Sequence, residues 1–394
     1  MTLAERWNEQ LTELRDLDRY RRLSLPRGID FSSNDYLGFG KERKGPDTFF
    51  SSGLASRLLQ GQRVIWEEVE TELARWHGAD AALMFTSGYV ANEGLLSTAI
   101  EPGDFVASDH SNHASIIDGL RLSKAERFVF RHNDLEHLES GLKAAARKRS
   151  TNGQLFVVSE SLFGMDGDRA PLVDLVELCE KYGAHLIVDE AHATGCFGRT
   201  GSGCVDEAGL RSRVLATVHT GGKALGVMGA YVCGSRVLRE LLINRCRHFI
   251  FTTALPPAVG SWWHEAIAQV QKADECRRRL HESGALFRVE LARQGITAGG
   301  SHYIVPIIIG NDVQANEASQ RLQEAGWDIR AIRPPSVPPG NARLRISIHA
   351  DHDRDTGLAA ARAVAEVVLR EPDAQARKQT LACASGSCVD AGAS

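Results

Sequence analysis

The feature that most constrains the fold is a regular alternation of short apolar runs and helical segments between about residues 66 and 220. The apolar or β-branched runs cover residues 81–85, 104–107, 127–130, 155–159, 185–188 and 214–218. Between them, segments such as 172–182 carry apolar residues at the 3.6-residue spacing of a helix. Short buried strands separated by helices are typical of βαβ units. We therefore expect an α/β fold with a large, mainly parallel sheet.

The flanking regions predict a second and smaller part. A helical pattern over 3–24 precedes the alternation, and a helix-rich stretch over 258–295 follows it. A second α/β pattern then predicts strands at 302–309, 329–332 and 342–348 and helices at 315–325 and 355–370. A chain of 394 residues is too long for one simple core. We predict an N-terminal segment (1–45), a large domain (46–270), a smaller C-terminal α/β domain (271–371) and a disordered tail (372–394).

The composition argues against several classes of protein. The formal net charge is −4, so no strong basic excess indicates a nucleic-acid partner. No window approaches the ~20 consecutive apolar residues of a membrane span, and the charged N-terminus does not look like a secretory signal. Eight cysteines include no CxxC pair, and Cys383 and Cys388 lie in the small, polar tail. We expect a cytoplasmic protein without a metal site.

Asp189 directly follows the apolar run 185–188, with His192 three residues further on. In parallel sheets ligands bind beyond the carboxyl ends of the strands. A buried carboxylate there needs a cationic or hydrogen-bonding partner, and a protonated pyridine nitrogen would be one. Helix capping by Asp189 or Glu190 is an equal alternative. Metal binding by Asp189 with His192 lacks an evident third ligand.

Lys223 follows the run 214–218 and the glycine pair Gly221-Gly222. The glycines allow a tight turn, and a desolvated lysine can form an imine with an aldehyde. Taken alone, the motif fits a surface lysine better. It is not the phosphate-binding loop of nucleotide hydrolases, since Thr217 and Ala224 stand where that loop needs a glycine and a hydroxyl residue.

Two further strand ends carry polar groups. Thr86, Ser87 and Gly88 open a helix, where free N–H groups favour a phosphate. His113, in the segment 108–115, could stack on an aromatic ring or be an ordinary core histidine. A phosphate cradle, a stacking imidazole, an acid and an imine-forming lysine therefore follow four strands in order. Together they predict a pyridoxal phosphate site.

Eight longer motifs extend this pattern over roughly residues 3–370. They are FSSNDYLG (31–38), SGYVAN (87–92), NHASIIDG (112–119), MDGD (165–168), VDEAHATG (188–195), TGGKALG (220–226), FTTALPP (251–257) and IRPPSVPPGNARLRIS (332–347). On these motifs the chain resembles the α-oxoamine synthases. These are fold-type I pyridoxal phosphate enzymes, similar in architecture to aspartate aminotransferase.

The resemblance implies a role for each matching position. Lys223 would carry pyridoxal 5′-phosphate as a Schiff base, Asp189 would pair with its ring nitrogen, and His113 would stack on the ring and polarise a thioester carbonyl. The other implied cofactor contacts are His192, Ser87, Gly88, Tyr89 and Thr220, with Thr252 or Thr253 reaching the phosphate from a neighbouring subunit. The implied substrate contacts are Arg345, for the amino-acid carboxylate, and Arg21, Asn34 and Ser336. A homodimer with shared active sites is also implied.

The resemblance further implies a decarboxylative condensation of an amino acid with an acyl thioester. We expect L-alanine and a pimeloyl group on coenzyme A or acyl carrier protein. Gly164, Trp66 and Leu58 replace a serine and two histidines common in the family, which leaves other amino acids and acyl donors open. A catalytically inactive subunit of a heterodimer is an alternative of another class. A nicotinamide-dependent oxidoreductase ranks last, because no GxGxxG opens a helix after the first strand.

Overall fold

The computed structural model describes residues 12–19, 28–33, 35–39, 52–148 and 153–369. These residues form two compact units. The larger comprises residues 34–282 and 349–351, and the smaller comprises the rest of the described chain. The predicted tail lies outside the described residues. The helix predicted over 3–24 is seen only at 12–16, and it ends before Asp18, whose backbone is left-handed (φ 52°).

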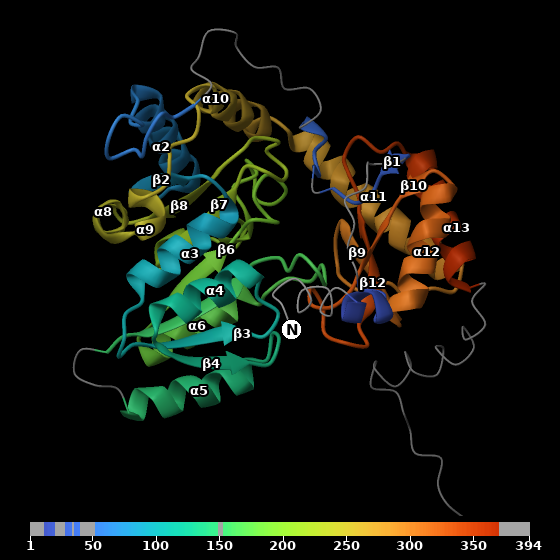
Figure 1. Ribbon diagram of the computed structural model, residues 1–394, viewed down its shortest axis with the longest axis horizontal. Coiled ribbons are helices and arrows are strands. Elements are labelled where there is room, and N and C mark those ends of the chain that lie inside the picture. Colours follow the sequence, from blue (N-terminus) through green and yellow to red (C-terminus); the bar gives the residue numbers. More distant parts are fainter. Residues whose placement is uncertain (1–11, 20–27, 34, 40–51, 149–152, 370–394) are drawn as a thin grey trace, which may run out of the picture. The chain divides into compact units, whose positions relative to one another are not determined.

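A seven-stranded sheet forms the centre of the larger unit, in the order β2-β8-β7-β6-β5-β3-β4 (Figure 1). The strands are β2 (Ala81–Phe85), β3 (Phe105–Asp109), β4 (Glu126–Phe130), β5 (Leu155–Glu160), β6 (Ala184–Asp189), β7 (Ala216–Thr220) and β8 (Ala230–Gly234). All pairs are parallel except those of β8, which runs antiparallel to β2 and β7. The other six strands therefore end at one edge of the sheet.

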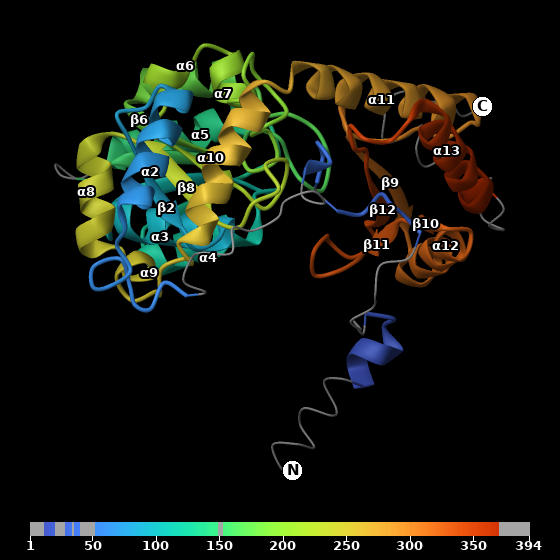
Figure 2. The ribbon, with the colours of Figure 1, turned by 90° about the horizontal axis from the view of Figure 1, so that it is seen from above.

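Helices cover the sheet on both sides (Figures 1 and 2). They are α2 (Val64–His77), α3 (Gly88–Ala99), α4 (Ala114–Ser123), α5 (Leu135–Lys148), α6 (Leu172–Tyr182), α7 (Cys204–Glu207), the 3₁₀ turn η2 (Arg211–Arg213), α8 (Arg236–Arg245), α9 (Arg247–Ile250) and α10 (Ala258–Gln271). None of the described helices combines the length and apolar character needed to cross a membrane.

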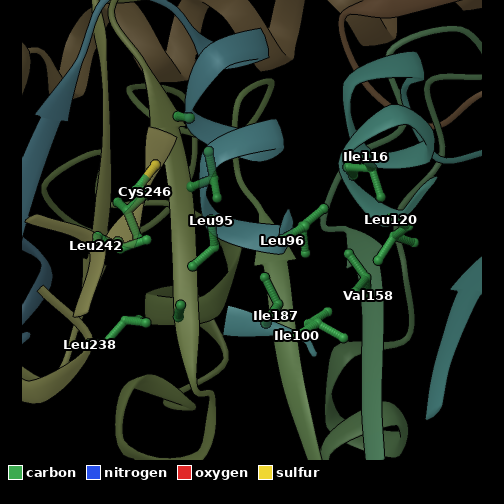
Figure 3. Close-up of a cluster of buried hydrophobic side chains, with 14 of the residues drawn as sticks. Leu95, Leu96, Ile100, Ile116, Leu120, Val158, Ile187, Leu238, Leu242 and Cys246 are labelled. Carbon is green, nitrogen blue, oxygen red and sulfur yellow. The ribbon is translucent and has the colours of Figure 1, made fainter. Parts of the chain in front are cut away.

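One buried cluster fixes α3 and α4 on the sheet (Figure 3). Leu95 and Leu96 of α3 and Ile116 of α4 pack with Val158 of β5 and Ile187 of β6. Burial of one such side chain stabilises the fold by roughly 1.5–3 kcal/mol. Because α3 follows β2 and α4 follows β3, this packing holds the first turns of both helices at the carboxyl edge of the sheet.

The smaller unit contains an antiparallel three-stranded sheet in the order β11-β12-β9. Its strands are β9 (Ile304–Gly310), β11 (Arg330–Ile332) and β12 (Ala342–Ser347), and a short parallel pair joins β1 (Ile29–Asp30) to β10 (Trp327–Asp328). The helices are α12 (Asp312–Glu324) and α13 (Arg354–Leu369), while α11 (Asp274–Arg293) contributes residues to both units. Helix α12 packs against β9, β12 and α13 (Figure 2).

Candidate active site

Asp189 ends β6 at the carboxyl edge of the central sheet, and its side chain is only 5% exposed. One carboxylate oxygen accepts a hydrogen bond of 2.7 Å from the Asn92 side chain of α3, and the other accepts one of 2.7 Å from the backbone N–H of Ala191. Asn92 also donates to the Ser115 hydroxyl at 2.9 Å. Such donors stabilise the charged form of a buried carboxyl group. Asp189 is therefore held in place as a partner for a cation.

The neighbouring acid, Glu190, has a different role. Its buried carboxyl group accepts hydrogen bonds from the backbone N–H groups of Cys204 (3.1 Å) and Val205 (3.3 Å) at the start of α7. Burial raises the pKa of Glu190 to about 7. Helix capping was an alternative for either acid. Glu190 caps the start of α7, whereas Asp189 accepts a hydrogen bond from Asn92.

Lys223 lies just beyond β7, in a turn that requires glycine at position 221. A Cβ atom on Gly221 would lie 2.4 Å from the Val227 carbonyl oxygen and 2.6 Å from the Trp263 ring. Lys223 is half-buried, and its positive charge acts to lower the pKa of both His113 and Glu160. The amine is therefore within electrostatic range of the groups at the ends of β3 and β5.

His113 caps the first turn of α4. Its Nδ1 atom accepts the backbone N–H of Ser115 at 3.3 Å and lies 2.8 Å from the Ser115 hydroxyl, and the Tyr89 ring meets it edge-on at 6.0 Å. Part of the side chain is exposed, yet the surrounding protein atoms and the Lys223 charge lower the pKa of the imidazole, against the opposing charge of Asp189. These effects favour the uncharged form of the His113 ring.

The start of α3 lies beside the end of β7. Ser87 caps this helix by accepting the N–H of Val90 at 3.3 Å, and a Cβ atom on Gly88 would lie 3.5 Å from Thr220. The first N–H groups of a helix have no partner within it, and the helix dipole favours an anion there. Tyr89, 39% exposed, donates its hydroxyl to Asp118. The turn thus has the geometry of a phosphate site.

His192 is buried (7% exposed), and its Nδ1 atom lies 2.8 Å from the Tyr36 hydroxyl. Its Nε2 atom faces Gly164: a Cβ atom on that glycine would lie 2.2 Å from it. The glycine that replaces the usual serine of the family motif therefore gives His192 its space.

The remaining predicted residues make none of the contacts described above. Thr252 and Thr253 line a small pocket together with Thr86 and Trp66 of the larger unit. Ser336 and Arg345 belong to the smaller unit, where Ser336 is exposed and Arg345, buried on β12, donates to the Ser347 hydroxyl at 2.9 Å. Arg21 and Asn34 lie outside the described residues.

Four residues of this site were missed when the sequence was interpreted: Tyr36, Asn92, Ser115 and Glu160. The first three stand inside motifs that carried the resemblance, so the motifs located them without indicating their contacts. Glu160 follows the predicted strand 155–159, and the rule that ligands bind at strand ends could have found it.

These groups fit pyridoxal phosphate. A helix start with a hydroxyl cap suits the phosphate, a lysine suits the aldehyde, and a buried carboxylate held by Asn92 suits the ring nitrogen. All of these residues belong to the larger unit.

Comparisons with known proteins agree with this geometry. The family model for class I and II aminotransferases matches residues 26–364. The 8-amino-7-oxononanoate synthase of Chlorobaculum parvum is 41% identical over 380 residues, covering 89% of this chain and 95% of the relative. A serine palmitoyltransferase from S. paucimobilis, solved with a pyridoxal phosphate–myriocin adduct, has a TM-score of 0.85 at 29% identity and covers 93% of this chain and 98% of that one.

The structure of 8-amino-7-oxononanoate synthase from Francisella tularensis has a TM-score of 0.71 at 26% identity, covering 86% of this chain and 98% of that one. The chain therefore belongs to the class I and II aminotransferase family and, within it, to the α-oxoamine synthases. This confirms the predicted family and the predicted fold-type I class.

Proposed function

We propose that this enzyme condenses L-alanine with a pimeloyl thioester, with loss of carbon dioxide, to give 8-amino-7-oxononanoate for biotin synthesis. The protein is a pyridoxal phosphate-dependent acyltransferase of the α-oxoamine synthase family. The observation that carries the proposal is the grouping of Lys223, His113 and the Asn92-bound Asp189 at one edge of the sheet. The name of the C. parvum relative supports the particular substrates.

Pyridoxal phosphate supplies an electron sink that stabilises a carbanion next to the amino group of the substrate. In this proposal the negative charge of Asp189 keeps the ring nitrogen protonated, and Asn92 and the Ala191 N–H keep the carboxylate aimed at it. Lys223 would hold the cofactor through its aldehyde group, and the lysine amine, when not bound to the cofactor, would take the α-proton of the amino-acid substrate.

The tautomer of His113 follows from its contacts. A backbone N–H can only donate, so Nδ1 of His113 accepts the Ser115 N–H, and the proton of the neutral ring lies on Nε2. We assign to this Nε2–H a hydrogen bond to the thioester carbonyl oxygen. The same donor would stabilise the negative charge that develops on that oxygen as the carbon–carbon bond forms.

Four residues are proposed to contact the substrates. Arg345 would bind the amino-acid carboxylate, for which the planar guanidinium provides two parallel donors. Arg21, Asn34 and Ser336 are proposed as further substrate contacts. His192 would hydrogen-bond the phenolic oxygen of the cofactor, with its ring oriented by Tyr36.

We also propose a homodimer in which Thr252 or Thr253 contacts the partner's phosphate. Thr253 pairs with Ser56, and exposed apolar side chains stand close to both in the sequence: Leu59 is 74% and Phe251 is 71% exposed. Large apolar side chains grouped on a surface are characteristic of a protein interface. A partner subunit would cover them and reach the threonines.

A second candidate function is another α-oxoamine synthase activity, and the TM-score of 0.85 with serine palmitoyltransferase favours keeping it. 2-Amino-3-ketobutyrate ligase and 5-aminolevulinate synthase share the same chemistry with other substrates. The presence of Lys223, Asp189 and His113 argues against an inactive partner subunit.

A substrate matrix tests the proposal. Purified enzyme is incubated with alanine, glycine or serine and with acetyl, pimeloyl or palmitoyl thioesters, the pimeloyl group being offered both on coenzyme A and on acyl carrier protein. The proposal expects 8-amino-7-oxononanoate by mass spectrometry, with the highest kcat/KM for alanine and a pimeloyl thioester. A preference for serine with palmitoyl, or for glycine with acetyl, would contradict the assigned substrates and leave the family intact.

A further inference from the structure

Glu160 is a buried acid that none of the roles above uses. It ends β5 and is 5% exposed. In the parallel pairing of β5 with β6, its register partner is Asp189. Two carboxyl groups therefore lie on adjacent strands at the centre of the candidate cofactor site.

The contacts of Glu160 join two parts of that site. Its Oε1 atom accepts the backbone N–H of His113 at 2.7 Å, and its carboxyl group also accepts the backbone N–H of Gly164. Its own N–H donates to the Asn112 side chain at 3.2 Å. Glu160 thus ties the start of α4, which carries the His113 ring, to the turn on which Gly164 faces His192.

Two charged groups act on Glu160: Asp189 from β6 and Lys223 from beyond β7. His113, at the start of α4, contacts Glu160 through its backbone N–H. Burial and the Asp189 charge raise the pKa of Glu160 to about 8, although Lys223 and the two N–H donors oppose the shift. Two neighbouring buried carboxyl groups resist being charged together. Of the two, Glu160 is the one whose pKa is raised above neutral, so its carboxyl group is mostly uncharged at neutral pH.

We propose that Glu160 is a positioning residue of the cofactor site, and that its uncharged carboxyl group holds His113 and the Gly164 turn in place while leaving Asp189 as the charged partner of the cofactor. The inference rests on the proposed function, since the roles of His113 and His192 come from it. A charged group at 160 would compete with Asp189 for the same cation. An uncharged group accepts the two N–H bonds without that competition.

The test compares Glu160→Gln, Glu160→Ala and the control Ser159→Ala. Glutamine keeps an acceptor oxygen but cannot ionise, and alanine removes the acceptor. Ser159 is the adjacent buried polar residue of β5, and its hydroxyl donates to the Glu160 carbonyl oxygen at 3.1 Å. Amide hydrogen exchange is measured in peptides spanning 110–116 and 161–168, together with visible circular dichroism of the holoenzyme from pH 6 to 9.5.

We expect exchange in both peptides to be about tenfold faster in Glu160→Ala, the change expected for the loss of one backbone hydrogen bond. It should be unchanged in Glu160→Gln and Ser159→Ala. The wild-type dichroism should change between pH 7 and 9, and this change should be absent in Glu160→Gln. Normal exchange in Glu160→Ala, or an equal effect in Ser159→Ala, would overturn the positioning role.

Disruption in Glu160→Gln equal to that in the alanine variant would show that the carboxylate charge is needed, and would overturn the uncharged form. If the alanine variant does not fold, the glutamine variant and its pH profile still decide the question. Failure of the proposed function can be distinguished from failure of this inference, because hydrogen exchange is measured without turnover and without any acyl donor. A wild-type protein without a visible cofactor signal would refute the function rather than the hydrogen bonds of Glu160.

Discussion

A charged histidine fixes the loop beside the candidate site, and its removal gives a sharp prediction. His132 lies between two carboxylates, with Nδ1 2.8 Å from Asp109 and Nε2 2.9 Å from Asp168. Burial opposes the charge of the imidazolium, but these two carboxylates raise its pKa from 6.5 to about 10. These two contacts of His132 with Asp109 and Asp168, here called the His132 clamp, join the ends of β3 and β4 to the loop 161–168, which carries Gly164.

The sign of the pH dependence follows from linkage. A pKa raised in the folded state adds stability that is fully present below the unfolded value, near 6.5, and is lost as the pH rises through the folded value, near 10. Raising the pKa of His132 from 6.5 to about 10 corresponds to an upper limit of ~5 kcal/mol of stability. Because the His132 side chain is 26% exposed, solvent screens the pair, and we expect about half of that.

The perturbation is His132→Gln, which keeps hydrogen-bonding capacity without the charge. Unfolding by urea is followed by fluorescence for both proteins at pH 6 and pH 10.5. We expect His132→Gln to be less stable than the wild type by about 2–3 kcal/mol at pH 6, and the difference to shrink to below about 1 kcal/mol at pH 10.5. Other groups titrate over this range in both proteins and cancel in the comparison. A difference that is equal at the two pH values would refute the charged clamp.

Three further predictions concern the site itself. Asp189→Asn should retain some cofactor but slow the exchange of the substrate α-proton by about a hundredfold or more, measured by NMR in deuterium oxide; a normal rate would remove Asp189 from the ring nitrogen. Gly164→Ser should push His192 away from Tyr36 and weaken cofactor binding by about tenfold, the loss expected for one hydrogen bond, measured by equilibrium titration. Unchanged affinity would mean that the backbone around position 164 moves instead of His192. Arg345→Ala should raise the KM for the amino acid by tenfold or more with a smaller change in kcat, since one buried charge pair is lost; an unchanged KM would exclude it from the carboxylate site.

Much of the fold of the larger unit followed from local sequence patterns. Six strands of its sheet coincide with the apolar or β-branched runs. Five of them are mostly buried, and strands covered on both faces favour such residues, whereas the edge strand β4 is largely exposed. Strand β8 was missed. It runs antiparallel beside β7, so a short glycine-containing connection replaces the crossover helix that marked the other strands.

The candidate site was less predictable than the fold. Position after a strand pointed to Asp189, Lys223 and His113, and the structure brings them within electrostatic range of one another. The residues that orient them, such as Asn92 and Glu160, come from other strands and helices. Their hydrogen bonds join positions 97 and 47 residues apart, and no local pattern encodes such contacts.

The most direct test of the central claim is the chemical identification of the lysine that holds the cofactor. The purified protein is reduced with borohydride and digested, and the peptides are mapped by mass spectrometry beside a Lys223→Ala variant. We predict reduced pyridoxal phosphate on Lys223, and loss of both the label and the visible absorbance in the variant. Labelling of another lysine, or a reducible linkage that persists in Lys223→Ala, would contradict the assignment on which the proposed mechanism depends.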